Sequence, residues 1–149
     1  MAVSSICSHN VATIGPDADV AEAAERMRKE HVGDLIVAEF KQARLVPLGI
    51  ITDRDIVVAV VAKKVDPSTL TVGDVMSDRL LTVREDNGID FALREMRRFG
   101  VRRVPVVGSE GELVGVLSID DVVDHLATQL SHIGDIIRFG QRAEAEARP

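Results

Sequence analysis

Two short pairs of hydroxyl and carboxylate residues are the side chains best suited to hold a small polar molecule. Thr52 is followed three residues later by Asp55, and Ser118 is followed in the same way by Asp121. At the start of a helix, such a pair forms a capping box in which each side chain satisfies a backbone amide of the other residue. The same carboxylate can accept hydrogen bonds from both hydroxyls of a ribose, and the hydroxyl and free amides at the positive helix end can receive a phosphate. Both interpretations stay open.

The two pairs occupy equivalent places because the chain repeats itself. Nine residues recur 69 positions later, beginning with Val3 as Val72 and ending with Val37 as Val106. Residues 49–57 return as residues 115–123 at an offset of 66, so the first copy holds three extra residues between Ala38 and Leu48. Two copies of a ~60-residue unit, too small to bury its own sheet well, predict a paired body with pseudo-two-fold symmetry. A cleft between the halves is a natural place for a small ligand.

Each copy follows the order β-α-β-β-α. We predict strands at 11–14 and 80–83, helices at 20–31 and 89–99, hairpins built from 35–38 with 48–51 and from 104–107 with 113–117, and second helices that start at Asp53 and Ile119. The predicted fold is α/β (α+β), with two pseudo-symmetric repeats packed through their small sheets. The first repeat would span residues 1–65 and the second 66–130, with a linker at 63–71 and a helical, solvated tail at 131–149.

Composition excludes several classes of function. The net charge of −6 and the aromatic content of 3% argue against a nucleic-acid partner, because phosphate-backbone binders are basic and single strands stack on aromatic rings. Cys7 is the only cysteine, which rules out an intramolecular disulfide, and the four histidines show no spacing typical of metal ligands. The chain shows no signal peptide, and its longest apolar stretch, 56–62, is too short to cross a bilayer. We therefore predict a cytoplasmic protein that needs neither a metal nor a membrane.

These motifs resemble a tandem pair of cystathionine-β-synthase (CBS) domains, often called a Bateman module. The resemblance lies in the doubled β-α-β-β-α unit and in the pattern Gly-hydrophobic-hydrophobic-Thr/Ser-x-x-Asp before the last helix of each unit. Residues 72–77 resemble the segment that opens a CBS unit, and residues 101–107 resemble its central strand. The similarity covers about residues 3–128. It implies a stand-alone, homodimeric regulatory module that requires no cofactor, has no chemistry of its own and senses AMP, ADP, ATP, S-adenosylmethionine or NAD.

The resemblance also implies which residues bind the ligand. Asp55 and Asp121 would bind ribose, and Thr52 and Ser118 would lie near ribose or phosphate. Basic residues would bind the phosphate, and residues of the strands would line the pocket for the adenosine. The basic residues are Arg102 and Arg103, and the lining residues are Thr13, Thr82, Val104, Pro105 and Ile36.

The two sites are not expected to be equal. In the first copy, Gly33 and Asp34 stand where the second copy has Arg102 and Arg103. An acid there repels phosphate, whereas a guanidinium fork matches phosphate oxygens, and Arg54 would compensate only in part. We therefore expect one site to bind phosphorylated ligands better than the other.

Two other functions are weighed against ligand sensing. Asp53 and Asp55 resemble the nucleophile loop of aspartate-dependent phosphotransferases, in which one carboxylate attacks phosphorus and the other handles the proton. However, the duplicate has Ile119 in place of the nucleophile, and no P-loop or dinucleotide glycine pattern is present. The second alternative is an oligomerisation or partner-docking module with an empty cleft, because the capping boxes need no ligand.

Apolar stripes on the second helix of each repeat predict a homodimer, since exposed apolar patches usually mark interfaces and two-fold pairing is the commonest assembly. The tail would add to that contact or fold back, and a regulated protein partner is expected that the sequence does not identify. The stripes are Ile56, Val57, Val60 and Val61, then Val122, Val123, Leu126 and Leu130, and the tail residues are Ile133, Ile136, Ile137 and Phe139.

Overall fold

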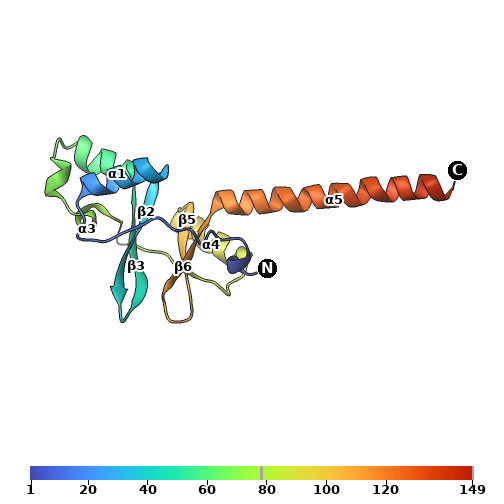
Figure 1. The fold of residues 1–149 in the computed structure, drawn as a ribbon, viewed down its shortest axis with the longest axis horizontal. Coiled ribbons are helices and arrows are strands. Elements are labelled where there is room, and N and C mark those ends of the chain that lie inside the picture. The colour runs from blue at the N-terminus through green and yellow to red at the C-terminus, as the bar shows by residue number, and fades with distance from the viewer. Residues whose placement is uncertain (78, 149) are drawn as a thin grey trace.

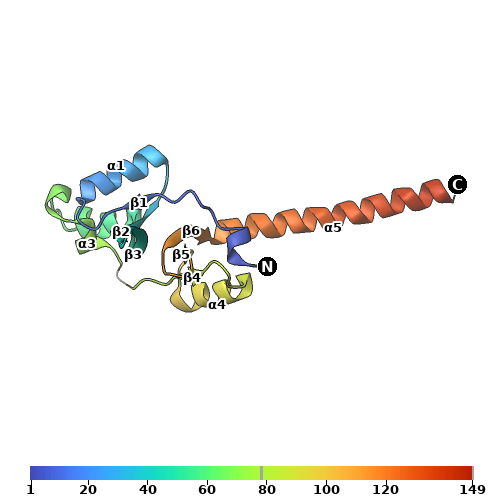
Figure 2. The ribbon, with the colours of Figure 1, turned by 60° about the horizontal axis from the view of Figure 1, so that its bottom comes forward.

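Two small sheets lie side by side in the body of the molecule, away from the far end of α5 (Figures 1 and 2). The computed structural model describes residues 1–77 and 79–148. One sheet has the strand order β1-β2-β3 and the other β4-β5-β6. In each sheet, the first strand pairs in parallel with the second, and the second pairs antiparallel with the third. Strands β3 and β6 contact each other, so the two repeats pack through their sheets as predicted.

The element boundaries follow the predicted β-α-β-β-α order in each repeat. The first repeat contains β1 (Thr13–Ile14), α1 (Val20–Glu30), β2 (Asp34–Lys41), β3 (Arg44–Thr52) and α2 (Asp53–Ile56), which continues as a π-helical turn over Val57–Val61. The second contains α3 (Val72–Val75), β4 (Val83–Arg84), α4 (Ile89–Phe99), β5 (Arg103–Val107), β6 (Leu113–Ser118) and α5 (Ile119–Ala147).

The first strand of each repeat is shorter than predicted. Only two residues of β1 pair with β2, and only two of β4 pair with β5. Thr13 therefore opens β1, and Thr82 precedes β4. The first hairpin is longer than its counterpart, because the three extra residues of the first repeat extend the pairing of β2 and β3 out to Lys41 and Arg44.

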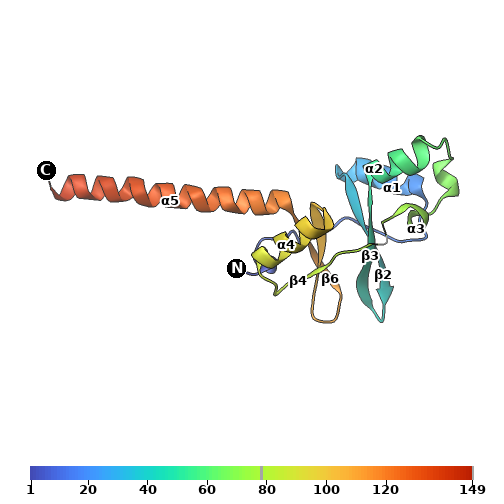
Figure 3. The ribbon, with the colours of Figure 1, turned by 180° about the vertical axis from the view of Figure 1, so that it is seen from behind.

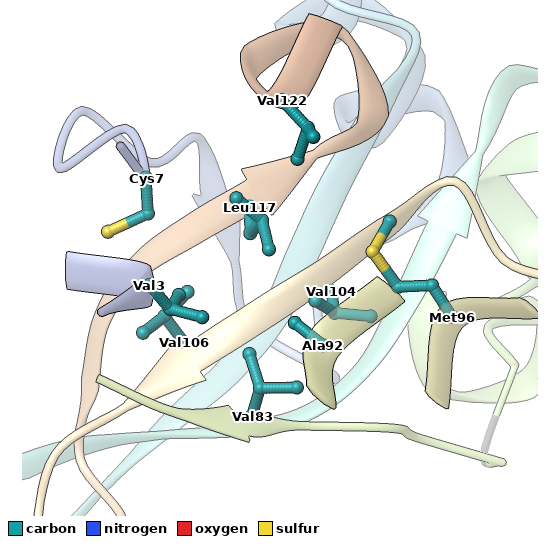
Figure 4. Close-up of a cluster of buried hydrophobic side chains, with 9 residues drawn as sticks. All are labelled: Val3, Cys7, Val83, Ala92, Met96, Val104, Val106, Leu117 and Val122. Atoms are coloured by element: carbon teal, nitrogen blue, oxygen red, sulfur yellow. The ribbon is translucent and has the colours of Figure 1, made fainter. Parts of the chain in front are cut away.

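The segment that opens each repeat in the sequence packs on the other repeat in space. Val3 and Cys7 belong to the apolar core of the second sheet, where they lie beside Val106 and Leu117 (Figure 4). Ser8 exchanges two backbone hydrogen bonds of 2.9 Å with Val116 of β6. In the same way, Val72, Val75 and Met76 pack on the core of the first sheet, and Ser77 pairs with Ile50 of β3. Each packed unit therefore contains the opening segment of the other sequence repeat.

Helix α5 runs for 29 residues without a break, so the boundary predicted between residues 130 and 131 falls inside it. At a rise of 1.5 Å per residue, such a helix is about 43 Å long. Only its first turns pack on the second sheet, through buried Val122. The rest extends away from the body as a single rod (Figures 1 and 3).

Candidate functional site

A cleft of about 780 Å³ opens between the two repeats. Its walls come from the start of β2, the junction of β3 and α2, the chain that leads from α3 towards β4, the approach to β5 and the first turn of α5. Its lining residues are Gly33, Asp34, Ile50, Thr52, Asp53, Arg54, Asp55, Ser77, Arg79, Leu80, Leu81, Gly100, Val101, Arg102, Arg103 and Asp120. The cleft thus brings together five of the predicted binding residues, Thr52, Arg54, Asp55, Arg102 and Arg103, from both repeats.

The Thr52 and Asp55 pair forms the predicted capping box. The Thr52 amide donates to Oδ2 of Asp55 at 2.9 Å, and the Asp55 amide donates to the Thr52 hydroxyl at 3.1 Å. Within the described residues, no group donates to Oδ1 of Asp55, and the Thr52 hydroxyl has no acceptor for its own proton. The capping box therefore leaves one acceptor and one donor for a ligand.

The amides at the start of α2 already have acceptors within the protein. The Asp53 amide donates to the Gly33 carbonyl at 2.9 Å, the Arg54 amide to Oδ1 of Asp53 at 2.7 Å, and the Asp55 amide to Thr52. The capping network uses all three of these amides, because a short helix must satisfy its first N–H groups locally. The arginine side chains are therefore the groups of this cleft that are best placed to meet an anion.

An ion pair joins the repeats across the cleft, because Arg103 at the start of β5 contacts Asp34 at the start of β2. The Asp34 side chain is only 14% exposed. Burial raises the pKa of the Asp34 carboxyl; Arg103 opposes this shift, and Asp53 adds to it. The predicted acid at position 34 thus lies in the same cleft as Arg103 and neutralises that guanidinium.

Replacing Asp34 with Asn should raise the melting temperature at neutral pH by a few degrees. The pKa of the Asp34 carboxyl is higher in the folded than in the unfolded state. The folded protein therefore becomes less stable as the pH rises from the unfolded to the folded pKa, and ionised Asp34 destabilises it at pH 7. Asn keeps an acceptor for Arg103 without the charge. In melting curves of both proteins, the difference should shrink as the pH falls towards about 3.9, the ordinary value for Asp. A variant less stable at pH 7 would contradict this.

The other basic side chains of the cleft are held weakly. Arg102 lies 3.9 Å from Asp120, and both side chains are largely exposed, a geometry that contributes little to stability. The Arg79 guanidinium stacks over Phe99, 5.1 Å from the ring centroid. Arg79 was not predicted from the sequence, because it lies outside the repeated motifs. It lines the cleft because the chain between α3 and β4 runs along it. Arg102 and Arg79 can both turn towards an anion at small cost.

The apolar wall of the cleft differs from the predicted one. Val104, Pro105 and Ile36 are buried within the sheets and do not line the cleft. Neither Thr13 nor Thr82 lines it. Apolar side chains reach the cleft instead from one position of β3, from the segment before β4 and from the residue after α4; they are Ile50, Leu80, Leu81 and Val101.

The second capping box lies outside this cleft. Ser118 and Asp121 make the same two backbone contacts, at 2.8 and 3.1 Å, but the Ser118 hydroxyl also donates to Oδ2 of Asp121 at 2.6 Å. Asp121 faces a hollow of about 210 Å³ that it shares with Ile6, Asp124, His125 and Thr128. Neither Arg102 nor Arg103 lines this hollow, so the two pseudo-equivalent carboxylates have different surroundings.

No three His, Cys, Asp or Glu side chains within residues 1–77 and 79–148 come close enough together to hold a metal ion. Over the same part of the chain, none of the helices is both long and apolar enough to cross a membrane.

Known proteins share both the sequence pattern and the fold. The CBS domain family matches the chain twice, at residues 3–62 and 72–128. Hypoxic response protein 1 of Mycobacterium tuberculosis is 36% identical over 121 residues, which cover 81% of this chain and 82% of that protein. An uncharacterised protein of Methanopyrus kandleri is 32% identical over 123 residues; they cover 83% of this chain but only 61% of that protein.

Two solved structures are similar over most of the chain. Hypoxic Response Protein I with two coordinated zinc ions aligns with a TM-score of 0.72 and 31% identity, over 84% of this chain and 98% of that one. A CBS domain protein from Pyrobaculum aerophilum complexed with AMP aligns with a TM-score of 0.73 and 28% identity, over 86% of this chain and 99% of that one. The chain therefore belongs to the CBS domain family and consists of a tandem pair of CBS domains.

Proposed function

We propose that this CBS pair is a regulatory module that binds an adenosine-containing ligand in the cleft between its repeats. One observation carries the proposal: Asp55, with a free carboxylate oxygen, and Arg102 and Arg103 line the same cleft although they come from different repeats. The carboxylate matches the two hydroxyls of a ribose, and the guanidinium groups match phosphate oxygens. At about 780 Å³, the cleft is within the usual range for small-molecule sites.

The chemistry of the cleft favours a ligand with a phosphate close to its ribose. Ile50, Leu80, Leu81 and Val101 provide an apolar wall for a purine. The AMP complex of the Pyrobaculum aerophilum relative supports this ligand class. AMP, ADP, ATP, S-adenosylmethionine and NAD all remain candidates, and Ser118 and Asp121, with Thr13, Thr82, Val104, Pro105 and Ile36, remain candidate contacts in a second site.

Ligand binding would act on the contact between the repeats. The ion pair of Asp34 and Arg103 ties β2 to β5 across the cleft. A phosphate that binds Arg103 competes with Asp34, so occupancy changes how the two halves are held together. A ligand with different affinities for two arrangements shifts the balance between them, which is how a module without catalytic activity can act as a sensor.

We also propose a non-catalytic, cytoplasmic homodimer. The predicted apolar stripes are only partly available, since Val60 and Val122 are buried in their own chain. Val57, Val61 and Val123 remain 54–64% exposed and are still available to a second copy. The phosphotransferase alternative finds less support, because Asp53 and Asp55 each hold a backbone amide of the capping network.

A thermal-shift panel with AMP, ADP, ATP, S-adenosylmethionine and NAD tests the proposed function. A ligand present at ~100 times its dissociation constant adds about 2.7 kcal/mol to the free energy of unfolding. In a chain of this size, that gain raises the melting temperature by roughly 5–10 °C. Guanosine nucleotides at equal concentration serve as the control for charge alone. If none of the five adenosine compounds shifts the melting temperature, the docking-module alternative replaces the sensor.

A further inference from the structure

The part of helix α5 that leaves the body carries an uncovered apolar stripe. The stripe residues follow one another at intervals of three, four, three and four. This is the a/d spacing of a coiled coil, in which each apolar side chain packs into a hole formed by the facing helix. Each is between 54% and 69% exposed, so no other part of the described chain covers it. They are Val123, Leu126, Leu130, Ile133 and Ile137.

We infer that this stripe, called here the α5 seam, pairs with the α5 seam of a second copy in antiparallel orientation. The inference deepens the homodimer proposed above, for which it names the surface and the direction of pairing. An isolated helix projecting into water is marginally stable, and most helical stability in proteins comes from packing of an apolar face. A second copy supplies that packing with the same residues on both sides of a two-fold axis.

The distribution of charge along α5 gives the orientation. The first two turns carry Asp120, Asp121 and Asp124 and no basic residue, whereas the second half has both signs of charge, with Arg138 and Arg142 among Asp135, Glu144 and Glu146. Parallel helices would place the acidic turns side by side. Antiparallel helices keep these acidic turns at opposite ends of the pair, and they also oppose the two helix dipoles.

An antiparallel register exists that pairs four of the five seam residues with one another. When Leu130 lies against Ile133 of the second copy, Leu126 lies against Ile137 of that copy, since both pairs share one two-fold axis. In this register, Val123 lies against Gly140 of the second copy. The positions that flank the seam carry no charge, as Ala127, Gln129 and Gly134 illustrate, so the copies meet without like-charge repulsion.

The charge of α5 argues against a membrane as the occupant. Residues 119–147 contain six carboxylates and two arginines. Amphipathic helices that lie on membranes are rich in Lys and Arg, which anionic lipid headgroups attract. An acidic helix with a heptad seam fits a second copy of itself better.

Sedimentation velocity of the full chain tests the pairing. The mass obtained for the wild type should be twice the chain mass of 16.2 kDa. The mass of the double variant Leu130→Glu, Ile133→Glu should equal that of one chain. Both positions are exposed, so the body should stay folded and keep its ligand-induced thermal shift. Phe139→Glu is the matched control, because Phe139 is 67% exposed on the same helix but lies outside the seam, and this variant should remain dimeric.

Three results would overturn the pairing through the α5 seam. A monomeric wild type removes the homodimer altogether. A dimer that survives Leu130→Glu with Ile133→Glu but dissociates with Val57→Glu and Val61→Glu places the contact on the body, which leaves the homodimer intact and the seam wrong. Binding of a monomeric wild type to vesicles of anionic lipid, lost in the seam variant, would assign the seam to a membrane instead.

Disulfide cross-linking decides the direction. Chains with Leu126→Cys and chains with Ile137→Cys are prepared separately, mixed and oxidised. Antiparallel pairing should join one chain of each kind, whereas parallel pairing would cross-link each variant with itself. The wild type is the control for Cys7, which is buried and should form no intermolecular disulfide.

Discussion

Asp55→Asn is expected to weaken binding of the adenosine ligand by roughly 10- to 100-fold. Hydrogen bonds to a charged group contribute about 1.5–3 kcal/mol, and a loss of 1.4 kcal/mol is tenfold in affinity. The amide oxygen of Asn can still accept from the Thr52 amide, which is 2.9 Å from Oδ2 of Asp55, so the start of α2 should remain capped. Calorimetric titration with the ligand that gives the largest thermal shift measures the change.

Asp74→Asn is the matched control for this substitution. Asp74 forms a capping box with Thr71 whose distances, 2.9 and 3.2 Å, are close to those of Asp55 and Thr52, but it lies outside the cleft. Both variants lose a capping carboxylate, and only Asp55→Asn should lose affinity. Equal affinity of Asp55→Asn and the wild type would remove Asp55 from the site, and an equal loss in both variants would attribute the effect to helix capping.

Gly49→Ala is expected to destabilise the fold by about 1–3 kcal/mol, as overpacking in a tight interior does, and to impair ligand binding as well. A Cβ at Gly49 would lie 2.6 Å from the Ser77 carbonyl oxygen and 2.9 Å from the sulfur of Met76. The backbone of residues 76–77 must therefore move. Ser77 lines the cleft, so the strain reaches the site. Denaturant unfolding gives the stability, and titration gives the affinity.

Gly115→Ala provides the comparison, because Gly115 is the counterpart of Gly49 in the second repeat. A Cβ there would lie 2.9 Å from the Ser8 carbonyl oxygen and 3.0 Å from the sulfur of Cys7. Ser8 does not line the cleft. Gly115→Ala should therefore lose stability while its affinity changes little. If the two variants lost affinity equally, the effect would come from general destabilisation and not from the position of Ser77.

Local patterns explain most of what the sequence predicts correctly. The capping boxes of Thr52 with Asp55 and of Ser118 with Asp121 involve residues three positions apart, so the sequence contains both partners. The long helices follow from apolar residues at helical spacing. The start of each second helix follows from its cap, because capping is a contact between near neighbours.

Contacts between distant segments were not predictable in the same way. The similarity of the two repeats gives no signal that Val3 and Cys7 pack on the second sheet and Val72 on the first, since either repeat could accept either segment. The site depends on this exchange, because it brings Ser77 into the cleft. The apolar wall of the cleft also differs from the predicted one. Leu80 and Leu81, which follow Ser77, line the cleft, whereas Val104 and Ile36 are buried within the sheets.

The sequence by itself determined that the chain is a doubled β-α-β-β-α unit and that two capping boxes mark equivalent places. It also determined that, of the two equivalent central strands, only the one at 104–107 directly follows basic residues. The tertiary structure decided that Asp55 of one repeat shares a cleft with Arg103 of the other, that Asp34 holds Arg103 there, and that α5 leaves the body. The reason is physical: hydrogen bonds and helical periodicity act between near neighbours, whereas the cleft forms where two separately encoded surfaces pack.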